Sequence, residues 1–596
     1  MDAIASQDAI TMEIVRSALN AISAEMGTAV VRGGYSTSIK EGGDASNAIF
    51  DAAGRLVAQS DSTPLLHLCS LRPSLGEVIK DFPLETMRDG DVYLTNDPFR
   101  GGIHSNDILL FKPVFHEGSP AFFTGTLIHV ADVGGMSAGG LPANATEIYH
   151  EGLILPPLRF HEAGVANRTL IALLCANSRT PDKLMGDLEA LLGGVNVGAA
   201  RLKALIAKYG LERLNGIVDG LIEYAERRTR QEIANLRPGS YEGSFAIDDD
   251  GIEVRPGGFV VRVKVTIEGS RFTVDFTGTD RQARGAINAA VSQTMSGVLF
   301  ALRCLIDPTI PLNDGCYAPI EMVLPPGTLV NPNMPAAVNS RIATIGAITD
   351  AILDAMSGVY PEKGVAASCS VHVSTPTGLD RKTGRPWIFI AAINGGGGAR
   401  VGKDGVDCAG GPLIIQGFGG AGTPTETLEM EYPILVERVE MWRDSGGAGR
   451  YRGGVGSLRD IRMLEDGMVT ARIADRSIFP PRGIHGGSPG VGGQWVINRG
   501  SPDERVLPPK ITNHPFKAGD VLTMAGSGGG GVGNPFERDP DEVLADVQEH
   551  KVSLAAARQR YGVAILGEPG DEALARIDDE QTARLRQAAS SGAAHS

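Results

Sequence analysis

Residues 107–133 read DILLFKPVFHEGSPAFFTGTLIHVADV, two apolar runs on either side of the polar break HEGSP. Runs of this kind about a glycine-containing break are typical of a β-hairpin. If the hairpin turns symmetrically about Gly118, position 107 faces position 129. Asp107 and His129 would then have Cβ atoms about 5 Å apart, close enough to share one ion. His104, in a glycine-bearing bend just before the first strand, can reach the same point.

These three residues are therefore candidate metal ligands. Imidazole and carboxylate ligands suit zinc, manganese or iron, whereas sites of six oxygens suit magnesium or calcium. The alternative is that each is an ordinary hydrogen-bonding or solvated residue at a strand end. The prediction depends on the register, because a slip of one residue would turn His129 to the other face of the sheet.

Two further residues near this region could take part. Asp44, in EGGDASNAIF, precedes a second predicted hairpin at 47–60 and could supply a fourth ligand, although local grounds favour a turn or cap role for it. His67, in PLLHLCS, is by default a histidine of the core. It could shuttle protons only if it faces the metal.

The rest of the chain predicts a mixed α/β, multi-domain fold. An amphipathic helix is expected at 8–31, with Asp8 as its cap, and the best linker candidate is LRPGSYEG near 236–243. The tail after about residue 585 should be loose. The expected regions are a hairpin-rich metal-binding region at 1–162, a helical segment at 163–238, a central α/β region at 239–385, a glycine-rich, mostly β region at 386–540, and C-terminal helices with the tail at 541–596.

Composition excludes several classes of protein. The chain has 596 residues, of which 55 are basic and 70 acidic, and it shows no basic stripe, so nucleic acid is not an expected partner. The start of the chain lacks the apolar core of a secretory signal, and no apolar run approaches membrane-spanning length. The six cysteines are scattered without a CxxC pair, as expected for reduced thiols in the cytoplasm.

No nucleotide-binding motif is complete in the sequence. Residues 397–404 nearly fit the phosphate-binding pattern GxxxxGK[ST], but Asp404 stands where a hydroxyl is needed to bind magnesium. The following residues, GVDCAGG, cannot form the helix whose N-terminus would cradle phosphate. The glycine runs at 393–398 and 526–531 are interpreted as structural turns.

Seven motifs resemble the B-type chains of the hydantoinase B/oxoprolinase family, and the resemblance runs from about residue 10 to 566. They are GGDASNAIFDAAGRLVAQ, LTNDPFRGGIHSNDI, HVADVGG, EIYHEGLILPP, NSRTPDKLMGDL, VERVEMWRDSGGAGRYRGG and GSGGGGVGNPFERDPDEVL. The resemblance covers ATP-dependent hydantoinases, oxoprolinases and caprolactamases, and more distantly the metal subunits of acetone-type carboxylases. It is specific for the family and does not identify the substrate.

The resemblance implies a metal site and a partner. Matching motif by motif, it implies that Asp44, His104, Asp107 and His129 bind zinc or manganese, with iron as a further alternative. It also implies a hydantoinase A-type partner subunit, in a heterotetramer, which carries ATP-Mg and phosphorylates a small cyclic amide. Water activated by the metal would then complete ring opening. Asp132 or His67 would handle the proton.

Two alternatives stay open beside the cyclic-amide hydrolase. The same metal could serve an ATP-dependent ketone carboxylase, although carboxylase members tend to have longer metal subunits than this chain. In the second alternative, the metal holds the subunit together and the chain is a non-catalytic scaffold. A structural site closes its coordination positions with protein, whereas a catalytic one leaves room for water or substrate.

Overall fold

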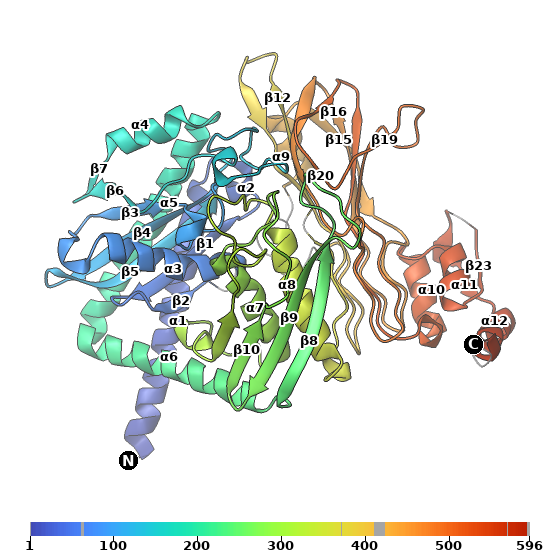
Figure 1. Ribbon diagram of the computed structural model, residues 1–596, viewed down its shortest axis with the longest axis horizontal. Helices are drawn as coiled ribbons and strands as arrows, with labels where there is room; N and C mark the ends of the chain where they lie inside the picture. Colours follow the sequence, from blue (N-terminus) through green and yellow to red (C-terminus); the bar gives the residue numbers. More distant parts are fainter. Residues whose placement is uncertain (1, 61–64, 371, 410–422, 569, 593–596) are drawn as a thin grey trace.

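The computed structural model describes residues 2–592 apart from 61–64, 371, 410–422 and 569. Three bodies of structure follow one another along the chain: an N-terminal sheet with its helices, a central sheet with two long helices, and a C-terminal half of strands and extended segments that ends in short helices (Figure 1). This arrangement confirms the predicted mixed α/β, multi-domain class.

The N-terminal sheet has seven antiparallel strands in the order β2-β1-β5-β4-β3-β6-β7. Both predicted hairpins belong to it: β1 pairs with β2, and β4 pairs with β5. The strands are β1 (Ala45–Asp51), β2 (Leu56–Gln59), β3 (Val92–Thr95), β4 (Asp107–His116), β5 (Ser119–His129), β6 (Leu158–Glu162) and β7 (Val165–Ala166).

Both faces of this sheet are buried. On one face, Ile108 and Leu110 of β4 join a core with leucines of α5 (Pro181–Tyr209). On the other face, Leu109 and Phe111 join a core with α3 (Leu65–Asp81) and the central body. Strands covered on two sides read as continuous apolar runs. This accounts for the apolar run at 108–111 in β4.

Helix α5 is long and apolar enough to cross a membrane by length and composition alone. In the fold it packs between α1 (Asp2–Gly33) and the sheet. The hydroxyl of Thr124 in β5 donates a hydrogen bond to the Val195 carbonyl in α5, at 3.0 Å. A Cβ on Gly198 would lie 2.4 Å from Met26 Sδ, so the small residue lets α1 approach closely. Core packing accounts for the apolar character of this helix.

The register of the β4–β5 hairpin places Asp107 opposite His129, which confirms the prediction. The turn itself is not centred on Gly118, however. Glu117 and Gly118 both have positive φ, as a two-residue turn of the hairpin type requires, and the turn closes with His116 opposite Ser119. Continued regularly, that pairing would set Asp107 against Ile128. A bulge corrects it, because Val114 pairs with Phe122 while Phe115 pairs with Pro120, which leaves Ala121 as the extra residue.

The central body is a four-stranded sheet in the order β11-β10-β9-β8, covered by two helices (Figure 1). Its elements are β8 (Gly239–Ile247), β9 (Phe259–Glu268), β10 (Arg271–Asp275), β11 (Ile320–Val323), α7 (Val291–Leu305) and α8 (Ile342–Ser357). Buried and exposed residues alternate along β9, so one face of this sheet meets solvent. A Cβ on Gly243 would lie 2.1 Å from the Ala351 carbonyl, which explains how closely α8 crosses the sheet.

Two further sheets in the C-terminal half enclose their own core, which includes Trp387, Trp495 and Phe516. One runs β13-β12-β17-β20, with β14 and β21 attached, and the other runs β15-β16-β22-β18-β19. Their strands are β12 (His372–Leu379), β13 (Pro386–Ile388), β14 (Ala391–Ile393), β15 (Ile434–Met441), β16 (Ser457–Met463), β17 (Gly467–Ile473), β18 (Gln494–Ile497), β19 (Arg505–Val506), β20 (Lys510–Ile511), β21 (His514–Phe516) and β22 (Val521–Ala525).

The glycine runs are structural, but they are not turns. Segments around Gly396, Gly454 and Gly529 lie side by side as extended chain, and we call them the glycine layer. Gly454 N donates to the Gly397 carbonyl and Gly529 N donates to the Gly454 carbonyl, both at 2.9 Å. A Cβ on Gly396 would lie 1.8 Å from the Gly454 carbonyl oxygen. Glycine is therefore required here by backbone packed against backbone.

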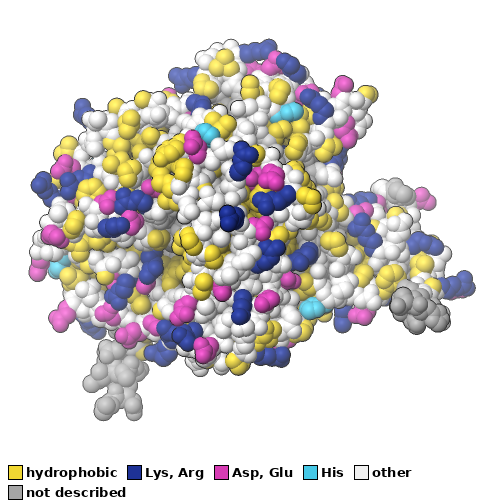
Figure 2. Space-filling model, in the orientation of Figure 1, with side chains coloured by type: hydrophobic (Ala, Val, Ile, Leu, Met, Phe, Trp, Pro, Cys, Tyr) yellow, Lys and Arg dark blue, Asp and Glu magenta, His cyan; other side chains and the backbone are white. Residues whose placement is uncertain are grey.

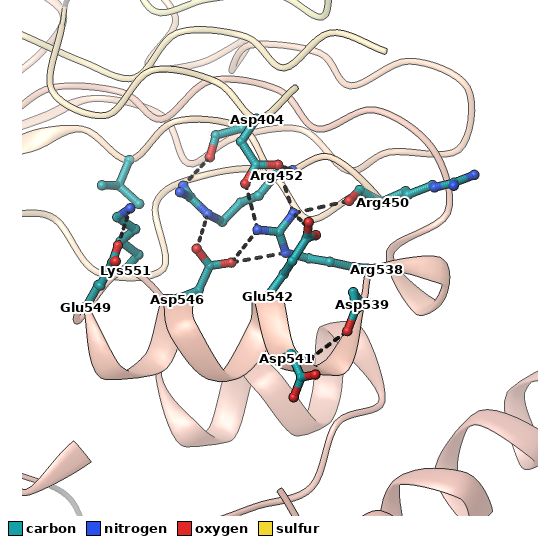
Figure 3. Close-up of polar contacts among 12 residues, drawn as sticks. Asp404, Arg450, Arg452, Arg538, Asp539, Asp541, Glu542, Asp546, Glu549 and Lys551 are labelled. Carbon is teal, nitrogen blue, oxygen red and sulfur yellow. Dashed lines mark hydrogen bonds and ion pairs between the residues drawn. The ribbon is translucent and has the colours of Figure 1, made fainter. Parts of the chain in front are cut away.

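A group of charges around two buried arginines joins the glycine layer to the C-terminal helices (Figure 3). We call it the arginine cluster, and it comprises Arg452, Arg538, Asp404, Asp407 and Asp546. Arg452 Nε donates to Asp546 at 3.1 Å, and its Nη1 donates to Asp407 at 2.9 Å. Asp404, the residue that spoils the phosphate-loop pattern, accepts from Arg538 and from the Arg452 backbone. Its carboxylate therefore has a structural partner.

Some predicted boundaries are wrong. Helix α1 begins at Asp2, so Asp8 lies inside it and does not cap it. The helices expected from residue 163 begin only at Arg168, with α4 (Arg168–Ala176), and continue through α5 and α6 (Leu211–Ala234). After α10 (Pro540–Gln548) and α11 (Leu554–Tyr561), the expected loose tail is instead a helix, α12 (Asp579–Gly592). Arg586 explains this, because it donates to the Arg538 carbonyl at 2.6 Å and so docks α12.

The visible surface carries both signs of charge intermingled, with basic and acidic side chains side by side (Figure 2). Exposed ion pairs occur in the described structure, such as Arg271 with Glu268 at 2.8 Å across the β9–β10 turn. Pairs of this exposed kind contribute little to stability.

Candidate metal centre

His104, Asp107 and His129 meet at one end of the N-terminal sheet. A nitrogen or oxygen of each lies within 4.8 Å of the others, the spacing of ligands around one ion. His129 Nδ1 is 3.1 Å from Asp107 Oδ1, and His104 Nε2 is 3.2 Å from Asp107 Oδ2. All three side chains are buried.

The local backbone explains how they converge. Asp107 and His129 are directly opposed at the open end of the β4–β5 hairpin. The Asp107 N–H donates to the His104 carbonyl at 2.9 Å, so the chain turns just before β4 and brings His104 back over the strand. Asn106 fixes the surroundings, because its side-chain amide donates to the carbonyls of Val130 and Gly139.

Asp44 completes the arrangement from the neighbouring strand. Strand β1 pairs with β5 so that Ala45 faces Ile128, and continuing this register by one residue sets Asp44 beside His129. Burial raises the pKa of Asp44 to about 7, with His129 and Arg341 opposing and Asp107 adding to the rise. Neither of its carboxylate oxygens accepts a hydrogen bond from the described part of the chain. A buried carboxylate in this state is costly unless a cation meets it.

The protonation states also suit a metal. Burial and Arg341 hold the pKa of His104 well below its usual value, so its imidazole is neutral at pH 7. Burial alone would raise the pKa of Asp107, but the two histidines and Arg341 outweigh it and hold that pKa below the usual range. Neutral imidazole and ionised carboxylate are the forms that bind metal ions. The four residues present therefore fit a divalent transition metal.

His67 lies next to this group. It sits in the first turn of α3, with its Nδ1 2.6 Å from the Ser46 hydroxyl and its Nε2 3.7 Å from Asp44. Burial lowers its pKa to about 4. His67 therefore lies beside Asp44, one of the four predicted ligands. Its role in proton transfer stays a prediction.

Asp132 has a different environment. One carboxylate oxygen accepts from the Gly139 N–H and from Arg179 Nη1, both at 2.9 Å. The other accepts from the N–H groups of Gly134 and Arg179. These bonds hold together the loop that follows β5, and they occupy the oxygens that a proton acceptor would use. Proton transfer by Asp132 likewise stays a prediction.

Sequence reasoning missed two charged residues beside the cluster. Arg341, at the start of α8, is 4% exposed, and its Nη2 lies 3.6 Å from Asp107 Oδ2. Glu151 is fully buried and accepts from the N–H groups of Val338 and Asn339, just before Arg341. Burial raises the pKa of Glu151 to about 8. A signal was available, because Arg341 interrupts the small and apolar run AAVNSRIATIGA at 336–347.

Comparison with known proteins gives consistent matches along the chain. Residues 8–535 match the family model described as Hydantoinase B/oxoprolinase. The B-type chain of a putative D-/L-hydantoinase from Pseudomonas sp. (strain NS671) is 30% identical, over 97% of this chain and 98% of that protein.

Two solved structures share the fold. The ATP-dependent caprolactamase from Pseudomonas jessenii matches with a TM-score of 0.85 and 28% identity, over 97% of this chain and 99% of that chain. Acetone carboxylase, in a nucleotide-free structure, matches with a TM-score of 0.85 over 98% of this chain and 84% of that chain, at 20% identity. At that identity the second similarity shows the fold alone. From the extent of the family match and the full-length relative, this chain belongs to the hydantoinase B/oxoprolinase family.

Proposed function

We propose that this chain is the metal-binding subunit of a two-component, ATP-dependent hydrolase of small cyclic amides. Asp44, His104, Asp107 and His129 hold one divalent transition metal, zinc or manganese by preference. An A-type partner subunit, in a heterotetramer, binds ATP-Mg and phosphorylates the ring amide. The proposed location of the complex is the cytoplasm, because all six cysteines are free of disulfide bonds, as suits a reducing compartment.

The observation that carries the proposal is the buried cluster itself. Two imidazoles and a carboxylate converge within 4.8 Å, and a second carboxylate beside them has no hydrogen-bond partner in the described structure. The relatives that share the fold and family bear the names of a hydantoinase component and a caprolactamase. A buried donor set of this chemistry, in this family, supports hydrolysis more directly than it supports scaffolding.

In the proposed mechanism, phosphorylation by the partner weakens the C–N bond of the ring and makes phosphate a leaving group. A divalent metal bound at the cluster would supply Lewis-acid activation of water. The residues of this chain hold that ion in a dry, fixed setting and move the proton. His67, hydrogen-bonded to Ser46 and facing Asp44, is oriented to take part in this transfer.

ATP-dependent carboxylation of a ketone is the second candidate function. It is favoured by one observation, the equal TM-score of 0.85 to acetone carboxylase. The lower identity of 20%, against 28% for the caprolactamase, makes it second.

The test is reconstitution with a hydantoinase A-type subunit from the same organism. Hydantoins, 5-oxoproline and caprolactam are supplied with ATP and scored for ring opening, and acetone with bicarbonate is scored for carboxylation. We expect ATP-dependent opening of at least one cyclic amide, lost on removal of the metal and regained on adding it. Carboxylation of acetone without ring opening of any cyclic amide would contradict the hydrolase proposal and support the ketone carboxylase. Full activity without any metal would leave the scaffold alternative.

A further inference from the structure

We propose that Arg341 is a substrate-binding residue, which holds two oxygens of an oxyanion beside the metal centre. The oxyanion we favour is the phosphoryl group of the activated amide. This inference rests on the proposed function and adds to it the chemistry that the site recognises.

Arg341 reaches the centre from another body of the protein. The proposed metal ligands belong to the N-terminal sheet, whereas Arg341 is the residue before α8 of the central body. Its guanidinium is almost completely buried, with Asp107, Glu151 and Asp44 as its neighbouring charges. The centre is therefore closed by a cation that comes from a second structural unit.

The hydrogen bonds of Arg341 are far from satisfied. An arginine side chain offers five N–H donors. Nη1 donates to the Asn339 carbonyl at 3.1 Å, and Nε has no acceptor among the described residues. Burial of an incompletely bonded guanidinium is costly.

Pairing with Asp107 does not account for this arginine. The 3.6 Å between Nη2 and Asp107 Oδ2 is an ion-pair distance and exceeds hydrogen-bonding distance, so this contact satisfies neither the Nη2 donors nor Oδ2 with a hydrogen bond. Once Asp107 binds a metal, it has still less to offer Arg341. The guanidinium would then need a different acceptor.

Glu151 holds the arginine in place without satisfying it. Its Oε1 accepts from the Val338 and Asn339 N–H groups at 2.6 and 2.9 Å, which fixes the turn leading into Arg341. These hydrogen bonds of Glu151 are to the backbone, and the guanidinium remains free to meet a ligand. The planar guanidinium group, fixed in this way, presents N–H donors whose spacing matches two oxygens of a phosphoryl or carboxylate group.

The test measures anion binding and metal content on the same metal-loaded, full-length protein. Inorganic phosphate and acetate are the two probes, titrated by calorimetry into wild type, Arg341→Gln and Arg341→Lys. The matched control is Arg213→Gln, which removes an exposed arginine of α6. Elemental analysis should find about one metal per chain in every variant, as expected for a single two-histidine, carboxylate site.

We expect Arg341→Gln to weaken phosphate binding by about tenfold or more, with Arg341→Lys intermediate because it keeps the charge and loses the fork. A loss confined to phosphate identifies the phosphoryl group, whereas an equal loss for acetate identifies a carboxylate of the substrate. Unchanged binding in Arg341→Gln, or no binding to wild type, would overturn the proposal. Loss of the metal from Arg341→Gln would also overturn it, since the arginine would then serve Asp107.

The assay is independent of the proposed function. It requires no cyclic amide and no partner subunit, so Arg341-dependent phosphate binding can hold even where reconstitution yields no ring opening. Conversely, ring opening with unaltered phosphate affinity in Arg341→Gln would retain the proposed function and remove this inference.

Discussion

The candidate metal centre and the arginine cluster both contain buried charges, yet they differ in how these charges are met. In the arginine cluster, Arg452 and Arg538 are bonded to Asp404, Asp407 and Asp546, so each guanidinium has carboxylate partners. In the metal centre, Asp44 accepts no hydrogen bond from a described residue, and Arg341 is only partly bonded. Satisfied buried charges indicate architecture, whereas unsatisfied ones indicate a missing ligand.

The largest expected effect is the loss of ring-opening activity when a residue of the candidate metal centre is replaced. Replacing His129 with Ala removes one ligand and leaves the partner's chemistry in place, so ring opening by the reconstituted complex should fall by several orders of magnitude. The fold should persist, because a chain of this size does not depend on one ion for its cores. Ring opening, metal content and circular dichroism are measured on one preparation.

An unchanged rate of ring opening in a folded His129→Ala protein would contradict the assignment of the metal. If that variant unfolds, Asp107→Asn is the gentler replacement, because it keeps the size of the side chain and removes its charge.

The arginine cluster should show the opposite behaviour. Arg452→Leu leaves Asp407 and Asp546 without their shared partner, and breaking a buried ion pair in this way costs about 3–5 kcal/mol in free energy of unfolding. Metal content should stay unchanged. The measurement is urea denaturation, with Arg271→Leu, which breaks an exposed pair, expected to cost less than about 1 kcal/mol. Equal costs for the two variants would show that the cluster is not structural.

A buried histidine outside both groups predicts a smaller effect, on the pH dependence of stability. Burial lowers the pKa of His372 in β12 from 6.5 to about 3. Between these values the unfolded chain binds a proton that the folded chain does not, so stability is lost as the pH falls from 6.5 towards 3. His372→Gln should therefore flatten the plot of unfolding free energy against pH in this window. The exposed His485→Gln is the control, and equal slopes in the two variants would contradict the prediction.

The smallest expected effect is the absence of ATP binding. Residues 398–404 approach a phosphate loop in sequence, but Asp404 is bound to Arg538 and to the Arg452 N–H within the arginine cluster. Calorimetry on this chain alone should detect no tight binding of ATP. Micromolar affinity of this chain alone for ATP would contradict the prediction, and loss of that affinity in Asp404→Asn would place the nucleotide site at this cluster.

Local pattern predicted much of the N-terminal sheet and part of the centre. The hairpin at 107–133 and the opposition of Asp107 and His129 followed from apolar runs about a polar break, although the turn lies between Glu117 and Gly118 and not on Gly118 itself. Arg341 could not be placed, because it reaches the centre only through the packing of the central body on the sheet. The glycine layer was misread for a similar reason, since its pairings join segments distant in sequence.

The bulge at Ala121 divides the β4–β5 hairpin into two parts that pair in different registers. In each pair from Asp107 to Val114, the residue numbers of the two partners give the same sum. In the pairs beyond the bulge, the sum is smaller by one. An insertion or deletion of one residue in one strand of the hairpin would therefore place a different residue opposite Asp107 and turn His129 away from it. Equal changes in both arms would leave the pair intact. The two strands of this hairpin can therefore change in length only by equal amounts. A homologue with one extra residue in one strand should need a second bulge to keep the residues equivalent to Asp107 and His129 opposed.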